Sequence, residues 1–137
     1  MANIYDVKII QEGPRNCRVR ASGILDTANL ASSALVTLAQ MTNNDGRPAG
    51  ILRGFRVDEI QFVSSSGISV IVEWEATANQ LIAAVSDANS QNWEDDGGLI
   101  PNLAAVGFTG TILLRTLNWT ASTQTFTLTF KLVKLYV

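Results

Sequence analysis

The 137-residue chain contains no histidine and a single cysteine, Cys17. Histidine is the usual general base near neutral pH and the commonest side-chain ligand for zinc, copper and iron, so most familiar hydrolase and metalloenzyme designs are excluded. One cysteine cannot form an internal disulfide, which excludes a disulfide-stapled secreted scaffold. The fold must therefore be stabilised by packing and hydrogen bonds.

Charge is also scarce, because charged residues make up 16% of the chain and hydrophobic residues 47%. A small soluble monomer normally covers more of its surface with charge. Two interpretations stay open: part of the surface faces another protein, or the exterior is an ordinary β surface rich in threonine, serine and asparagine. The net charge of −2 and the pI of about 5.0 give no overall field that attracts nucleic acid or an anionic membrane.

Long apolar runs are missing as well, and no segment approaches the roughly 18 residues that a membrane span needs. Residues 1–6 have neither the basic nor the apolar part of a secretory signal. We therefore expect a protein made in the cytosol, of its own cell or of a host, with no nucleic-acid and no membrane partner.

What the chain has in abundance is alternation of apolar and polar residues. In residues 68–76 the positions of Ile68 and Trp74 share one parity, and those of Glu73 and Glu75 share the other. That two-residue period is typical of a half-buried strand. We interpret residues 55–63 and 68–76 as the arms of a central β-hairpin, since residues 64–67 offer a turn whose glycine accepts positive φ.

The N-terminal residues predict a second hairpin. Residues 4–11 alternate until Ile10 breaks the pattern, residues 12–16 provide turn chemistry, and residues 17–23 alternate with Cys17 facing inward.

The middle of the chain is less distinctive. Residues 30–41 fit either a helix or a strand, and residues 43–50 are expected to form an exposed loop. A parity change predicts a bulge, or a crossing between sheets, at Asp58 and Glu59. Residues 81–85 indicate a short buried strand, with a one-turn helix as the alternative, and residues 86–91 a polar turn.

The C-terminal third has the clearest strand pattern. Residues 109–119 predict a strand interrupted by a glycine, and in residues 125–132 every even residue is apolar. Beyond Leu132 the apolar positions change parity, which we interpret as a strand that leaves one sheet and joins another. The whole chain, 1–137, is predicted to form one all-β domain: an antiparallel β-sandwich of jelly-roll or Greek-key type with about eight strands.

Residues that could carry chemistry each have a simpler explanation. Serines 64–66 lie in a turn, and Cys17 is expected in the core. The acidic residues 94–96 lack the spacing of a calcium loop, and Glu73 and Glu75 are expected to be solvated or salt-bridged. We predict no catalytic residue, no metal and no cofactor.

Candidate interface residues are easier to name than catalytic ones. Trp93 and Trp119 flank loops, where exposed aromatics are favoured at protein interfaces, although capping of the core is an equal alternative. Arg47 belongs to a set of arginines that could contact a partner's carboxylates or pair locally. With Leu99 and Ile100, these residues form the candidate interface.

Several segments together resemble small structural proteins of tailed bacteriophages. They are residues 5–16 (YDVKIIQEGPRN), 22–27 (SGILDT), 58–61 (DEIQ), 72–77 (VEWEAT) and a last strand that ends near 132–134 (LVK). The resemblance is to capsid decoration, or cement, proteins.

This resemblance implies a β-sandwich that forms a small homo-oligomer, a trimer or a dimer, and binds the major capsid protein on the outside of the head. The implied location is the capsid surface of the virion, after synthesis in the host cytoplasm. Two other functions stay open: a β-sandwich module that binds a glycan or a protein at the phage head or tail surface, and a small enzyme that uses Glu73 and Glu75.

Overall fold

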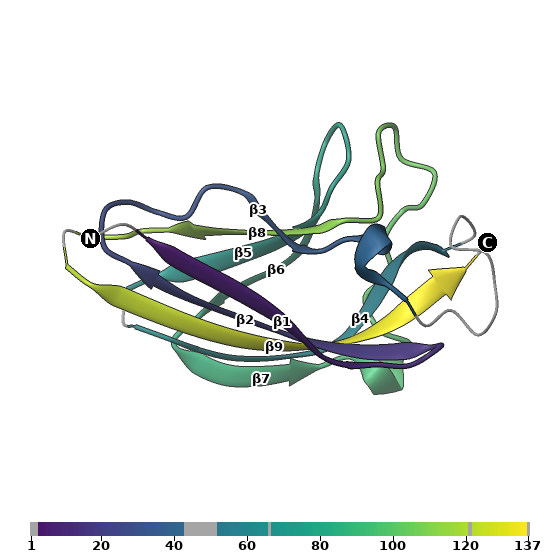
Figure 1. Ribbon diagram of the computed structural model, residues 1–137, viewed down its shortest axis with the longest axis horizontal. Helices are drawn as coiled ribbons and strands as arrows, with labels where there is room; N and C mark the ends of the chain where they lie inside the picture. Colours follow the sequence, from purple (N-terminus) through teal and green to yellow (C-terminus); the bar gives the residue numbers. More distant parts are fainter. Residues whose placement is uncertain (1–2, 43–51, 66, 121, 137) are drawn as a thin grey trace.

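The structure, a computed structural model, describes residues 3–42, 52–65, 67–120 and 122–136, which form two packed antiparallel sheets (Figure 1). The nine strands of these residues are β1 (Ile4–Glu12), β2 (Asn16–Leu25), β3 (Ser33–Val36), β4 (Leu52–Ser64), β5 (Ser69–Trp74), β6 (Gln80–Ser86), β7 (Ala88–Asn92), β8 (Ile112–Leu117) and β9 (Gln124–Tyr136). Two short 3-10 turns, η1 (Leu38–Gln40) and η3 (Glu94–Asp96), complete the described structure.

The strand order identifies the topology. One sheet runs β1-β2-β9-β4-β7 and the other β3-β8-β5-β6. When β1 is set aside, β2 to β9 have the order of an eight-stranded jelly roll, in which the chain crosses repeatedly between sheets and the first and last strands lie side by side. The predicted all-β sandwich of jelly-roll type is confirmed, with β1 added at one edge.

The core lies between the sheets and is filled by the inward parity of each strand. Phe126, Leu128, Phe130 and Leu132 of β9 are all buried, as the alternation predicts. Burying each such side chain contributes about 1.5–3 kcal/mol. A hydrogen bond of 3.1 Å from Trp74 Nε1 on β5 to the carbonyl oxygen of Phe55 on β4 connects the two sheets.

The N-terminal hairpin is confirmed as predicted. Strands β1 and β2 pair in antiparallel register, with an irregularity between Ile9 and Gln11 that leaves Ile10 exposed. Cys17 is buried. The predicted bulge near Asp58 is also present, as a register shift between Val57 and Glu59.

The predicted central hairpin is wrong. Its two arms are strands, but β4 pairs with β9 and β7, whereas β5 pairs with β6 and β8 in the other sheet. Gly67 does have positive φ, at 89°. A turn of this chemistry serves equally well for a hairpin or for a corner between sheets, so the turn alone does not reveal the partner of each strand.

The interpretation of β9 as a strand that changes sheets is also wrong. It stays in the five-stranded sheet, pairing with β2 up to Val133 and with β4 up to Tyr136. The apolar parity changes because Leu132 and Val133, which point to opposite faces, are both buried. Both faces of the sheet are therefore covered at this end.

Residues 86–91 were predicted to be a turn and instead contribute most of the edge strand β7, which pairs with β4. A polar edge strand gives no apolar alternation, because only its backbone is needed for the ladder. Residues 81–85 lie in β6 as expected, although Leu81 is exposed. Residues 30–41 contain both β3 and η1, and the predicted loop 43–50 lies outside the described residues.

The hydrogen bond between the sheets yields a stability prediction. Replacing Trp74 with Phe removes the indole N–H and leaves the Phe55 carbonyl without this buried donor. We expect a loss of about 1–3 kcal/mol in the free energy of unfolding, measured by urea denaturation. Val106→Ala, at an exposed position, is the control and should change stability by less than about 0.5 kcal/mol. Equal stability of both variants would contradict this role for the indole.

Candidate interaction surface

The register of the five-stranded sheet arranges its outward side chains in rows. One row crosses the sheet from Lys8 through Arg20, Thr129 and Gln61 to Ser90. Side chains directly opposite each other on antiparallel strands lie about 4.5–5.5 Å apart at Cβ, so each row is a continuous line of neighbours. The outer face is therefore a defined chemical surface.

The neighbouring row runs Asp6, Ser22, Thr127, Val63 and Ala88. In these two rows the charged residues lie on β1 and β2, and the residues on β9, β4 and β7 are uncharged, whereas the next row, Arg18, Lys131, Glu59 and Asn92, is charged as far as β4. The same sheet thus presents two different surfaces.

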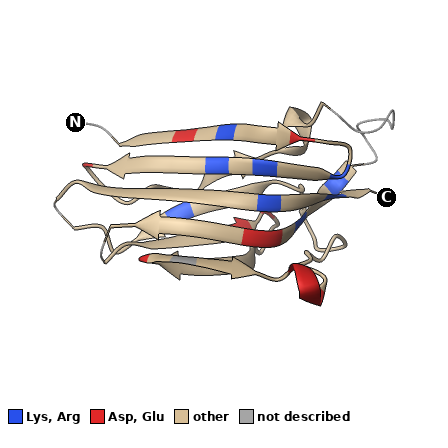
Figure 2. Cartoon of the chain, turned by 90° about the horizontal axis from the view of Figure 1, so that it is seen from below, with Lys and Arg blue, Asp and Glu red and all other residues tan. Residues whose placement is uncertain are grey.

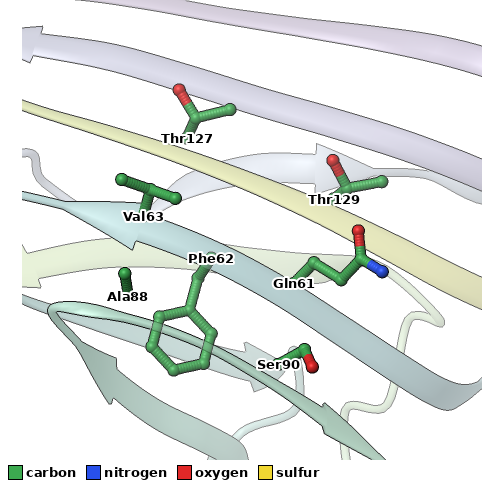
Figure 3. Close-up of a pocket in the computed structure, with 7 residues that line it drawn as sticks. All are labelled: Gln61, Phe62, Val63, Ala88, Ser90, Thr127 and Thr129. Atoms are coloured by element: carbon green, nitrogen blue, oxygen red, sulfur yellow. The ribbon is translucent and has the colours of Figure 1, made fainter.

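On the uncharged side, an open, shallow hollow of about 420 Å³ lies over β9, β4 and β7 (Figure 3). It is lined by Gln61, Phe62, Val63, Ala88, Ser90, Thr127 and Thr129. None of these residues has a titratable side chain. The hollow can offer hydroxyl and amide hydrogen bonds around Val63, which is 61% exposed, but no acid, base or nucleophile with a base beside it.

The tryptophans predicted for the interface are half-buried and pack against the core. The indole Nε1 of Trp119 donates to the carbonyl oxygens of Leu25 and Ser122, at 3.3 and 3.1 Å. The backbone N–H of Trp93 donates to the carbonyl oxygen of Asp58 at 2.7 Å. Both side chains therefore cover the edges of the core.

The remaining candidate residues are in different situations. Leu99 is half-buried and forms two backbone hydrogen bonds with Val57, whereas Ile100 is 62% exposed. Arg47 lies outside the described residues. Trp93, Leu99 and Ile100 share the segment after β7, while Trp119 lies in the β8–β9 connection at the opposite end of the sandwich (Figure 1). The structure does not bring the four described candidates together in one place.

The paired glutamates are already engaged by neighbours. Glu73 forms an ion pair of 3.1 Å with Arg115, and Glu75 accepts a hydrogen bond of 2.7 Å from Thr109 Oγ1. The salt-bridged interpretation is confirmed for Glu73. Burial raises the pKa of the Cys17 thiol to about 12, so it is protonated and unreactive at neutral pH. Among residues 3–42, 52–65, 67–120 and 122–136, no group of three or more histidine, cysteine, aspartate or glutamate residues could hold a metal ion.

Two ion pairs lie in the interior: the Arg56–Asp58 pair is the local pairing that was one alternative for the arginines, whereas the Lys134–Glu12 pair was not expected from the sequence. Asp58 is buried and receives two hydrogen bonds from the Arg56 guanidinium, and this contact raises the pKa of Arg56. Lys134 on β9 is completely buried, with its Nζ 2.7 Å from Glu12 Oε2 at the end of β1. Glu12 also accepts hydrogen bonds from the Thr42 backbone and hydroxyl, at 2.8 and 3.1 Å.

Comparisons with protein-family models, with curated proteins and with solved structures found no match to this chain. The resemblance to phage decoration proteins therefore stays a prediction. No helix in the described part of the chain is long and apolar enough to cross a membrane.

The buried pair yields a second stability prediction. Glu12→Gln leaves the Lys134 charge buried beside a neutral partner, and we expect a loss of about 3 kcal/mol in unfolding free energy. Adding Lys134→Met should recover most of this loss, because the buried charge is removed. Urea denaturation of the two variants measures both effects.

Glu94→Gln is the matched control, because its partner Lys131 is only partly buried. That variant should lose less than about 1 kcal/mol. A double variant no more stable than Glu12→Gln alone would show that the Lys134 charge is not the source of the loss.

Proposed function

We propose that this chain is a virion structural protein that decorates and stabilises a phage capsid, by self-association and by binding the major capsid protein. It acts at the capsid surface after synthesis in the host cytoplasm. This role requires contact surfaces and stiffness, and it requires no catalytic residue, metal or cofactor.

The observation that carries the proposal is the uncharged part of the outer face of the five-stranded sheet. Small-molecule sites are concave and surround most of their ligand, but this hollow is open and shallow, with an exposed valine among hydroxyl and amide groups. Protein interfaces combine an apolar centre depleted of charge with a polar rim. The surface around Val63 has this composition and suits a protein partner.

The fold supports the mechanical side of the proposal. A decoration protein must hold neighbouring capsid subunits together against the outward pressure of packaged DNA. Strand β9 is hydrogen-bonded along both of its edges, to β2 and to β4, over nearly its full length. A load on the outer face is therefore shared by many ladder hydrogen bonds, and no single contact carries it.

A second candidate function is a module that binds glycans at the phage head or tail surface. The hydroxyl and amide groups of the hollow favour it, because sugars are recognised through such hydrogen bonds. It predicts glycan-array signals that Gln61→Ala abolishes. The carboxylate enzyme ranks last, since Glu73 and Glu75 are engaged by other side chains.

Binding to capsids tests the proposed function. Purified protein mixed with heads that lack it should co-sediment and add density at capsid symmetry positions. Val63→Glu places a charge at the centre of the uncharged surface, and we expect at least a tenfold loss of affinity. No binding of the unchanged protein at saturating concentration would refute the proposal.

Val106→Glu is the matched control, because it adds the same charge at a valine that is 80% exposed in the segment between η3 and β8. It should bind heads normally. Equal loss of binding by both variants would mean that the contact surface lies elsewhere.

A further inference from the structure

The charged side of the outer face contains like charges placed directly opposite each other. Lys8 on β1 is paired with Arg20 on β2, and Arg18 on β2 is paired with Lys131 on β9. Figure 2, which views this sheet from outside, shows basic positions on the adjacent strands β1, β2 and β9, and an acidic position on β4 beside them. Like charges in directly opposed positions destabilise a sheet.

This repulsion is only partly relieved within the chain. Lys131 forms an ion pair of 2.8 Å with Glu94 of η3, and Glu59 on β4 lies directly opposite Lys131 on its other side. In the part of the chain that the structure describes, Lys8, Arg18 and Arg20 form no ion pair, and neither does Asp6 on the same face. Natural sequences break such local rules mainly where function requires it. The arrangement indicates a surface that is completed by an acidic partner.

An apolar side chain lies beside these charges. Ile10 is at the irregularity in β1, next to the segment that pairs with Arg18, and is 53% exposed. We call Lys8, Ile10, Arg18 and Arg20 the cationic edge.

The complementary surface lies on the same molecule, after the strand at the other edge of the sheet. The turn η3 follows β7, and its residues Asp95 and Asp96 are exposed. Ile100, four residues later, is 62% exposed. We call Asp95, Asp96 and Ile100 the acidic corner. Each of the two surfaces has one exposed isoleucine, and their charges are opposite.

We propose that the cationic edge of one copy binds the acidic corner of the next, so that copies associate head to tail. This inference rests on the self-association included in the proposed function and names the surfaces that carry it. Because the two surfaces differ, the contact is heterologous and generates either a closed ring or an open chain. A nucleic acid is disfavoured as the partner, since the net charge is −2 and acidic residues lie nearby.

The test measures molecular mass in solution as a function of protein and salt concentration. The unchanged protein should associate, and more weakly at 500 mM than at 50 mM salt because the charges are screened. Arg18→Glu/Arg20→Glu and Asp95→Lys/Asp96→Lys should each weaken association at least tenfold. The four changes combined restore opposite charges and the wild-type net charge, and should return the association constant to within threefold.

A second readout separates a lost contact from a damaged fold. In Arg18→Glu/Arg20→Glu both like-charge pairs become opposite-charge pairs, so the dilute, dissociated variant should melt about 2–6 °C higher than the wild type. Association and stability are thus expected to change in opposite directions. A merely misfolded variant would lose both.

Three outcomes would overturn the inference: a wild-type protein that is monomeric up to about 1 mM, association unaffected by either charge reversal, or no recovery in the combined variant. The capsid-binding experiment is independent of these outcomes. A protein that binds heads but fails this test refutes the head-to-tail contact and leaves capsid binding in place.

Discussion

The pairing of β9 on both sides is the constraint on which the rest of the structure depends. This strand lies between β2 and β4, and its inward phenylalanines and leucines form the centre of the core. A slip of one residue in its register would turn those side chains to solvent and bring threonines into the core, so the hydrophobic effect fixes the register strongly. Once β9 is fixed, the positions of β2 and β4 follow, and with them the edge strands β1 and β7.

The same register decides the chemistry of the outer face. Residues that alternate with the buried ones must point outward, so Thr127 and Thr129 lie between the basic residues of β2 and the uncharged residues of β4 and β7. Neither the hollow around Val63 nor the cationic edge is formed by a loop. Both are carried by paired strands, and a surface built on a ladder keeps its shape under load better than one built on a connection.

Most of the strands and their inward faces could be predicted from the sequence because alternation is local. Their partners could not, because a strand's own residues do not say which other strand it meets. Strands β4 and β5 are joined by a good turn yet lie in different sheets, and the polar strand β7 gives no apolar signal at all. The Lys134–Glu12 pair joins residues 122 positions apart, and a lysine in a terminal strand is normally expected at the surface. The tryptophans were ambiguous for a similar reason: the backbone carbonyls that accept from the Trp119 indole become its neighbours only after folding.

The two proposed contacts are compatible because they use different strands of one sheet. A head-to-tail contact would involve β1 and β2 on one copy and the turn after β7 on the next, leaving the uncharged face over β9 and β4 accessible between them. The apolar and hydroxyl surface could then bind a capsid while the charged surfaces hold neighbouring copies in line. Charge is well suited to the second task. Opposite charges fix the orientation of two copies, and like charges repel copies that meet through identical surfaces, without the need for a large buried interface. The repulsion between Lys8 and Arg20 would then favour assembly. It destabilises the free copy slightly, and the carboxylates of a neighbouring copy would relieve it on binding, which adds to the free energy of association.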